Sequence, residues 1–512
     1  VFAVVSGFFL FLTRQTIIVM SRLIENDLKN DIYAHLQSLN LSFYKKNNTG
    51  DVVARMSEDV GKVRMYLGPA VMYGINMLTS TVATIYFMFQ SNVELAIYSL
   101  LPMPLLSYSI FYISRRIENY STELQENLSD LSTTAQESFA GIRVVKSFAK
   151  EETVSRKFEQ NSASFKSKSM QLTKIQGLFQ PLMIGLIGLS ITLVVFVGSK
   201  KVMNGELNVG YIAQFILYII NLTWPFTAIG WVTSIVQRAE ASQARLNELF
   251  DHQNEILSEK QLRSPLKGHV VFSHVNFKYE DTGIQALKDV SFDILPGQSL
   301  GILGSTGSGK STIAALALRM YDVSSGRIFI DGHDIKDYDP QYLKKSIGYV
   351  PQDVFLFSDT IKNNIAFGVD EASLKSVERV AELADVHKNI VDFPQQYETM
   401  LGERGITLSG GQKQRVSIAR ALIKEPKILI LDDCLSAVDT KTEHTILNNL
   451  RQILRDRTSI IISHRVSSVK LADKIIVLDQ GEVVEVGTHD DLLKMGGVYK
   501  AIYEKQSSQE LV

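Results

Sequence analysis

Four long runs without a charged residue limit what this chain can fold into. The runs are Pro69–Gln90, Leu95–Ser114, Gln176–Ser199 and Val209–Gln237. Each is as long as the ~20 residues that a helix needs to cross a hydrocarbon core about 30 Å thick. One such run could be a buried core helix of a soluble protein, but four of them favour a membrane domain. Beyond Gln237 no uncharged run is long enough to span a bilayer.

A fifth apolar run, Val1–Thr13, is too short to span a bilayer and stops at Arg14. We interpret it as the remainder of a helix whose start lies before Val1, which gives five spans. A cleaved signal peptide is the less favoured interpretation, because no basic region precedes the apolar stretch.

Net charge and cysteine content limit the kinds of partner and site that we expect for this chain. The formal net charge is −1, so charge balance gives no support for a nucleic-acid partner. The single cysteine, Cys434, excludes a disulfide framework and a cysteine metal site.

A second kind of sequence begins at His269, where short β-branched runs alternate with helical patterns. This alternation is typical of an α/β domain with a largely parallel sheet. Within it the apolar run Ser299–Leu303 leads into a glycine-rich loop that ends where a helix begins. Glycines let backbone N–H groups surround phosphates, and the helix N-terminus adds a partial positive charge. The predicted nucleotide-binding residues of this loop are Gly304, Ser305, Thr306, Gly307, Ser308, Gly309, Lys310, Ser311 and Thr312.

Two side chains of this loop have predicted roles of their own. Lys310 should contact the outer phosphates, and the hydroxyl of Ser311 should ligate Mg²⁺. ATP and Mg²⁺ are therefore the expected ligands.

The orientation of the spans follows from the cytosolic location of ATP, which places the chain beyond Gln237 inside and Val1 outside. Basic residues agree, because the inside segments 21–68 and 115–175 carry several Lys and Arg, whereas the outer loop 91–94 has none. The pair Lys200-Lys201, in an outer loop, is an exception that does not overturn this count.

Two further motifs lie at definite distances from the phosphate loop. The run Leu408-Ser409-Gly410-Gly411-Gln412 stands about a hundred residues after it. The apolar run Ile428–Leu431 then ends in the two carboxylates Asp432 and Asp433, as a buried parallel strand with acids at its end would.

Together, the phosphate loop, Leu408–Gln412 and Asp432-Asp433 resemble the ABC ATPases. In that class two nucleotide domains sandwich ATP, and the signature serine and glycines of one chain close on the phosphates held by the other. The resemblance implies that Ser409, Gly410, Gly411 and Gln412 act on a partner's nucleotide.

The membrane half resembles ABC exporters with six membrane helices per half, the type IV fold of multidrug and lipid exporters. The motifs 43–51 and 137–148 are similar to the coupling-helix regions of that family, and Gly205–Gly210 to the start of its last span. The resemblance implies that five of six spans are present, with the elbow helix and first span absent. Importers keep membrane and ATPase domains on separate chains, so the fusion favours export.

The resemblance also implies residue roles in the ATPase domain. Asp432 would hold Mg²⁺, with Gln352 sensing it, and Asp433 would orient or deprotonate the attacking water. His464 would contact the γ-phosphate, and Tyr279 would stack on adenine. The expected catalytic residues are thus Asp433, His464, Gln352 and Lys310, and the expected metal ligands are Ser311, Gln352 and Asp432. Segments 436–439 and 402–405 resemble the D-loop and the X-loop.

Aspartate at position 433 departs from the family, which usually has glutamate there. The shorter side chain would fall ~1.5 Å short, and a misplacement near 1 Å can cost about a hundredfold in rate. Many heterodimeric exporters pair one such weak site with an altered signature in the partner. We therefore favour a heterodimer slightly over a homodimer whose aspartate still works.

The expected architecture is a multi-domain chain. An all-α transmembrane domain (1–245) and a linker (246–268) precede an α/β P-loop ABC ATPase domain (269–512). Its expected function is ATP-driven export of a hydrophobic or amphipathic drug, lipid or peptide, as half of a dimer in a bacterial inner or plasma membrane. The alternative is a degenerate ATP-binding half that gates or regulates a partner subunit or channel. A soluble chromosome or repair ATPase is excluded by the spans.

Overall fold

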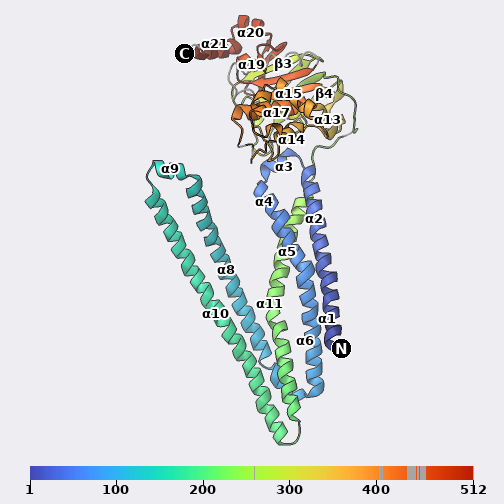
Figure 1. Cartoon of the computed structure of the whole chain (residues 1–512), viewed down its shortest axis with the longest axis vertical. Coiled ribbons are helices and arrows are strands. Elements are labelled where there is room, and N and C mark those ends of the chain that lie inside the picture. Colours follow the sequence, from blue (N-terminus) through green and yellow to red (C-terminus); the bar gives the residue numbers. More distant parts are fainter. Residues whose placement is uncertain are drawn as a thin grey trace. The chain divides into compact units, whose positions relative to one another are not determined.

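The computed structural model describes residues 1–258, 260–402, 405, 407–434, 445–446, 449 and 457–510 (Figure 1). Its contacts divide the chain into two compact units. The helical unit comprises Val1–Gln37 and Gly50–His252, and the sheet unit comprises Ser38–Thr49 and Gln253–Val512. This division follows contacts and does not test the predicted domain limits, which stay predictions.

The helical unit is built from long helices. Among the described residues, five helical stretches are long and apolar enough to cross a membrane. The first joins α1 (Phe2–Thr13), η1 (Arg14–Ile18) and α2 (Val19–Ser38), and the second joins α4 (Thr49–Ala54), η2 (Arg55–Asp59), α5 (Val60–Met65), η3 (Tyr66–Ala70) and α6 (Val71–Ser91). The other three are α7 (Val93–Leu100) with α8 (Met103–Ala140), then α10 (Glu151–Met203), then α11 (Val209–Asp251).

The short run at the start of the sequence belongs to one of these stretches. Arg14 does not end the helix, because α1, η1 and α2 continue without a break to Ser38. The prediction of five spans is thus confirmed, and the first of them extends well beyond its apolar part.

Local sequence explains where several of these helices begin. The side chain of Asn92 accepts a hydrogen bond from the backbone N–H of Leu95 and so caps α7. Asn208 accepts one from Gly210 and caps α11 in the same way. An N-cap side chain satisfies one of the N–H groups that have no partner within the helix.

Two short helices occupy the turns at the ends of the long ones. The helix α9 (Ile142–Ser147) connects α8 to α10, which run side by side as a hairpin (Figure 1). The helix α3 (Leu41–Lys46) follows α2 and is part of the sheet unit. The helix α9 lies within the motif 137–148, and α3 overlaps the start of the motif 43–51, the two segments that resemble coupling-helix regions.

The sheet unit contains two sheets. A four-stranded antiparallel sheet has the order β2-β1-β4-β5, and a six-stranded sheet has the order β10-β9-β3-β8-β7-β6. In the second, β9, β3, β8, β7 and β6 are parallel, and β10 pairs antiparallel with β9. The strands are β1 (Val270–Lys278), β2 (Gln285–Ile294), β3 (Ser299–Gly304), β4 (Ser325–Ile330), β5 (His333–Asp334), β6 (Ile347–Val350), β7 (Ile428–Asp432), β8 (Thr458–Ser463), β9 (Lys474–Asp479) and β10 (Glu482–Gly487).

Helices connect these strands along the chain. They are α12 (Lys310–Ala317), η4 (Ile335–Asp337), α13 (Pro340–Ser346), α14 (Ile361–Ala366), α15 (Leu374–Leu383), α16 (His387–Val391), η5 (Gln396–Glu398), α17 (Gly410–Leu422), α19 (Val466–Val469), α20 (His489–Met495) and α21 (Val498–Glu510). The central strands β7 and β8 are buried along their whole length, as expected of parallel strands covered on both faces.

The predicted α/β character with a largely parallel sheet is confirmed for the six-stranded sheet. The antiparallel sheet was not predicted. Its strands β1 and β2 alternate buried and exposed residues, with irregular register between them, so the pattern did not distinguish antiparallel from parallel pairing.

Candidate nucleotide site

The predicted site residues follow four neighbouring strands of the parallel sheet. The phosphate loop follows β3, His464 follows β8, Asp433 follows β7 and Gln352 lies just beyond β6. These strands are adjacent in the order β3-β8-β7-β6. Because the carboxyl ends of parallel strands meet at one edge of a sheet, segments far apart in sequence converge there, where open α/β sheets bind ligands.

Two glycines give the phosphate loop its shape. Gly309 has a φ of +98°, a left-handed conformation that side chains disfavour, and a Cβ there would collide with the carbonyl oxygen of Ala286. A Cβ at Gly304 would collide with the carbonyl oxygen of Leu478. The loop is therefore packed tightly against the sheet, with α12 beginning at Lys310.

Lys310 folds back over this loop. Its ammonium donates hydrogen bonds to the carbonyl oxygens of Gly304 (2.9 Å) and Ser305 (2.7 Å). Burial lowers the pKa of Lys310, although the nearby carboxylates Asp433 and Asp432 oppose this shift. The cation is thus held at the mouth of the loop, where phosphate oxygens would replace carbonyl oxygens as its partners.

A hydroxyl and a carboxylate lie together behind the loop. The hydroxyl of Ser311 donates to Oδ1 of Asp432 at 3.0 Å. Asp432 is buried at the end of β7, and this burial raises the pKa of its carboxyl. Oxygen ligands of these two kinds are what Mg²⁺ prefers alongside phosphates. The pair thus fits the predicted metal role.

The loop also contains a buried hydroxyl group that has no hydrogen-bond partner among the described residues. It belongs to Ser308, whose side chain is almost fully buried. Such a group is costly to leave unsatisfied, and a bound phosphate oxygen could accept from it. The polar atoms and the tight glycine turn therefore fit a nucleotide.

Asp433 contacts the other two predicted catalytic side chains that lie outside the loop. The ring nitrogen Nδ1 of His464 lies 2.9 Å from Oδ1 of Asp433 and 3.0 Å from Oδ2. The amide of Gln352 is at the limit of hydrogen bonding, 3.5 Å from Oδ2. Asp433 itself has a positive φ of 45°, which turns the chain sharply after β7.

Tyr279 lies beside the helix that starts at the phosphate loop. Its hydroxyl is 3.1 Å from the hydroxyl of Thr312, and its ring contacts Phe277 and Tyr321 edge to face. The ring is partly buried, so part of its surface remains open for stacking.

The sequence analysis missed one side chain near this ring. Lys45, on α3 within the sheet unit, places its ammonium 4.6 Å from the centroid of Tyr279 and 5.2 Å from that of Tyr321. A cation at such distances is attracted to the ring face. Lys45 stands in a predicted turn motif, but no sequence signal links it to a tyrosine more than two hundred residues away.

The signature segment is at the start of α17. Ser409 caps this helix, since its hydroxyl accepts from the N–H of Gln412 while Oε1 of Gln412 accepts from the N–H of Ser409 at 2.9 Å. Ser409 and Gly410 are exposed. Ser409 makes hydrogen bonds to Gln412 and Lys413, within the start of its own helix.

Two predicted segments lie wholly or partly outside the described residues. The D-loop segment 436–439 is outside them, and so are Glu403 and Arg404 of the X-loop segment.

Comparison with known protein families agrees with both halves of the chain. Residues 1–226 match the family described as ABC transporter transmembrane region, and residues 287–436 match the family described as ABC transporter.

Individual relatives match nearly the whole chain. The "Probable multidrug resistance ABC transporter ATP-binding/permease protein YheI" of Bacillus subtilis (strain 168) is 38% identical, over 95% of this chain and 83% of that protein. The "Multidrug resistance-like ATP-binding protein MdlA" of Escherichia coli (strain K12) is 37% identical, over 94% and 82%. The "ATP-dependent lipid A-core flippase" of Syntrophus aciditrophicus (strain SB) is 33% identical, over 95% and 81%.

A solved structure has the same fold. It is titled "Structure of a bacterial Atm1-family ABC exporter with ATP bound" and superposes with a TM-score of 0.81 at 30% identity, covering 95% of this chain and 86% of that chain. The chain therefore belongs to the ABC transporters, as a multi-pass membrane domain fused to an ATPase domain that drives transport.

Proposed function

We propose that this protein exports a hydrophobic or amphipathic substrate, a drug, lipid or peptide, at the expense of ATP. The observation that carries the proposal is the convergence of Lys310, Ser311, Asp432, Asp433 and His464 at one edge of the sheet, on a chain with five membrane helices. Relatives named as a multidrug resistance protein and a lipid A-core flippase support the direction and the kind of substrate.

In this proposal the phosphate loop binds the phosphates of ATP and Tyr279 stacks on its adenine. Ser311 and Asp432, with Gln352 beside them, hold Mg²⁺, which neutralises charge on the phosphates when bound. Asp433 orients or deprotonates the attacking water, and His464 contacts the γ-phosphate. The contact between His464 and Asp433 supports a hydrolytic site over a purely regulatory one.

The protein would work as half of a dimer. The exposed signature start, Ser409 and Gly410, supports this, because it leaves these groups free to meet nucleotide held by a second half-transporter. The second half could be a different chain, which the aspartate at position 433 favours, or a second copy. The ATPase domain would lie in the cytoplasm and the spans in a bacterial inner or plasma membrane.

An aromatic hollow in the helical unit supports an amphipathic substrate. Tyr73 on α6 lies between Trp224 and Trp231 of α11, with ring centroids 5.6 and 5.5 Å away. Both tryptophans are exposed, and with Thr227 and Ala228 they line a hollow of about 480 Å³. Aromatic faces bind apolar groups and attract cations, as an amphipathic substrate requires.

The test uses the fact that this chain has two tryptophans, Trp224 and Trp231. Intrinsic fluorescence of the reconstituted protein is titrated with rhodamine 6G, with a lysophospholipid and with glucose, and ATPase activity is measured alongside. The proposal expects the first two compounds to change both signals and glucose to change neither. ATP-dependent uptake of glucose into inside-out vesicles, with no response to any amphipathic compound, would contradict it. Lys310→Ala is the inactive control.

A further inference from the structure

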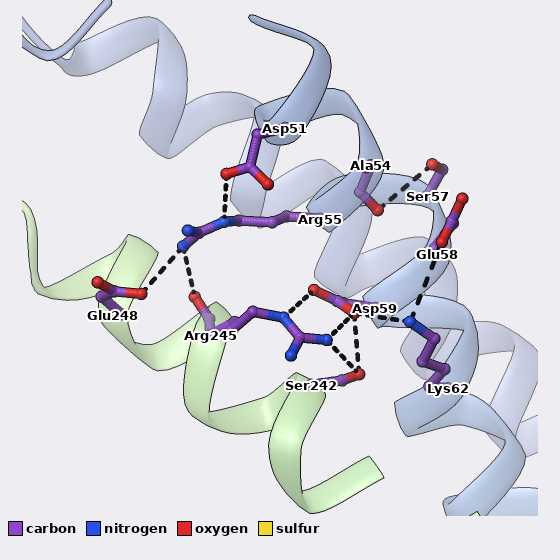
Figure 2. Close-up of polar contacts among 10 residues, drawn as sticks. All are labelled: Asp51, Ala54, Arg55, Ser57, Glu58, Asp59, Lys62, Ser242, Arg245 and Glu248. Carbon is purple, nitrogen blue, oxygen red and sulfur yellow. Dashed lines mark hydrogen bonds and ion pairs between the residues drawn. The ribbon is translucent and has the colours of Figure 1, made fainter. Parts of the chain in front are cut away.

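A buried carboxylate joins two helices within the helical unit. Asp59 ends η2 and is 4% exposed. It accepts hydrogen bonds from three side chains: Nε and Nη2 of Arg245 at 2.9 and 2.6 Å, the hydroxyl of Ser242 at 2.9 Å and the ammonium of Lys62 at 3.2 Å (Figure 2). Ser242 and Arg245 belong to α11, more than 180 residues away.

The hydrogen bonds that Asp59 accepts belong to a strong class, because the carboxylate and two of its donors are charged. The guanidinium of Arg245 binds the carboxylate through two nitrogens, and Ser242 is fully buried between the helices. Arg245 holds the pKa of Asp59 down at about 2, with Ser242 and Lys62 assisting. The carboxylate is therefore charged at all physiological pH values, so the contact does not switch with pH.

A second connection lies one turn away on the same two helices. Arg55 precedes Asp59 by four residues and donates to the backbone carbonyl of Arg245 and to Glu248, both at 3.2 Å (Figure 2). Asp51 accepts from Nε of Arg55 at 2.9 Å and orients it. Two arginines that point in opposite directions thus join the helices, one from each side.

The chain continues from the two joined helices into different parts of the protein. After Asp59 the chain continues through α5 and η3 into the membrane helix α6. After Arg245 it reaches the end of α11 at Asp251 and then enters the chain of the sheet unit at Gln253. The contact therefore connects the helical stretch that continues into α6 to the helix whose end is followed by the sheet unit in the chain.

The α8–α10 hairpin provides a contrast. Outside the membrane its two helices are joined by Ser164 to Asn127 at 2.9 Å and by Lys168 to Glu123 at 3.9 Å, pairs in which one side chain is exposed and the other half-buried. Partly exposed pairs of this kind contribute little. A third contact, Asn161 to the buried Thr134 at 3.2 Å, is a single uncharged hydrogen bond. In Figure 1 this hairpin diverges from α11 toward α9, whereas α5 lies beside α11.

We propose that Asp59, Ser242 and Arg245 form a clamp that makes the α5–α6 helix and α11 move as one body during the transport cycle. The three are positioning residues. They act through one another and pass movement of α11 to α6. The inference rests on the proposed ATP-driven transport, but its test reads ATP hydrolysis alone and needs no identified substrate.

The first experiment removes the clamp in the full-length transporter reconstituted in liposomes. Asp59→Asn should lower kcat for ATP hydrolysis by at least roughly tenfold, because a misplacement of about 1 Å caused far from the chemistry can cost up to about a hundredfold. The KM for ATP should stay unchanged, because the nucleotide site is untouched. Ser242→Ala should act in the same direction.

Two matched controls come from the hairpin. Ser164→Ala and Glu123→Gln remove the same kinds of interhelical contact at exposed positions, and both should leave kcat unchanged. The double variant Asp59→Asn/Arg245→Gln should lose no more than the worse single variant, since the two side chains act as one pair.

The second experiment replaces the clamp by a covalent link. In a Cys434→Ala parent, Asp59→Cys/Ser242→Cys should show the same loss of kcat, and bridging the two thiols with a short methanethiosulfonate reagent should restore kcat to within about twofold of the parent. Rescue by a link that carries no charge is not expected of a purely electrostatic contact.

Each remaining outcome overturns the inference. Inhibition by the bridge would mean that the helices must separate during turnover. Normal kcat in Asp59→Asn would mean that the clamp is dispensable. Failure of Asp59→Asn to fold, with both controls folded, would leave a structural role only. Absence of ATPase activity in the unmodified protein would instead count against the proposed function.

Discussion

The ring of His464 lies across both carboxylate oxygens of Asp433, with Nδ1 at 2.9 and 3.0 Å. These residues follow adjacent parallel strands, β8 and β7, so the sheet itself sets their separation. The shorter side chain at position 433 thus still reaches the histidine. It is one methylene shorter than glutamate, and the role that we propose for Asp433 would use that extra reach toward an attacking water.

Asp433→Glu tests how far that missing methylene limits hydrolysis. If the protein is a homodimer, both sites gain reach and turnover should rise strongly, up to about tenfold, which is ~1.4 kcal/mol of barrier. If it is the weak half of a heterodimer, the partner's altered signature still limits this site, and the rise should be modest. Steady-state ATPase activity of the full-length protein, alone and with a co-expressed partner, measures both.

Asp433→Asn also distinguishes a homodimer from a heterodimer, by removing the carboxylate. It should nearly abolish hydrolysis in a homodimer but leave much of it in a heterodimer, where the partner's glutamate still works. Robust activity of this chain alone that disappears in Asp433→Asn would refute our preference for a heterodimer.

Lys310→Ala should weaken nucleotide binding as well as turnover. The ammonium now bridges the carbonyl oxygens of Gly304 and Ser305, and it is the cation placed at the mouth of the loop. We expect at least tenfold weaker binding of Mg·ATP, about 1.4 kcal/mol, measured by equilibrium binding to the purified transporter. Lys310→Arg controls for the charge. Normal binding by Lys310→Ala would show that the loop is wrongly assigned.

Ser409→Arg should block ATP hydrolysis at a partner's site while nucleotide binding to this chain's own loop persists. Because Ser409 also caps α17, its loss costs about 1 kcal/mol of helix stability by itself. Ser409→Asn keeps a capping oxygen and separates the two effects. Azido-ATP labelling of each chain reports binding. Lost labelling of this chain with normal partner turnover would contradict a role in trans.

The sequence could predict that the candidate site residues gather at one edge of the sheet, because each motif is local and the parallel strands bring the motifs together. The loop at Gly304, the acids at the end of β7 and the histidine after β8 are each recognisable from their neighbours, and strand order does the rest. Four of the five membrane helices could be predicted equally directly, since their signal is the length of uncharged runs, whereas the first was inferred from the shorter run Val1–Thr13.

Contacts that depend on packing between helices far apart in the sequence could not be predicted from local motifs. Asp59 lies in a charged, helical segment in which an exposed carboxylate is the ordinary expectation, and nothing local marks it as buried against Arg245. The contact between the Lys45 ammonium and the Tyr279 ring could not be predicted for the same reason. The antiparallel sheet was missed because alternation in β1 specifies a half-buried strand without specifying its partner.

The buried state of Asp59 leads to a prediction about stability and pH. Its pKa falls from the ordinary 3.8 to about 2 in the folded protein. A carboxyl with a lowered folded pKa stabilises the fold fully above its unfolded pKa, and this contribution is lost as pH falls through the folded pKa.

The difference between the two pKa values of Asp59 corresponds to about 2 kcal/mol of folding stability. Asp59→Asn should therefore lower Tm by an amount that is constant between about pH 8 and pH 5 and shrinks below about pH 4. Thermal unfolding of detergent-solubilised parent and variant across this range measures the difference, with Glu123→Gln as the exposed control. A Tm difference that changed between pH 8 and pH 5 would mean that Asp59 titrates there, and the ion pair with Arg245 would then not hold it charged.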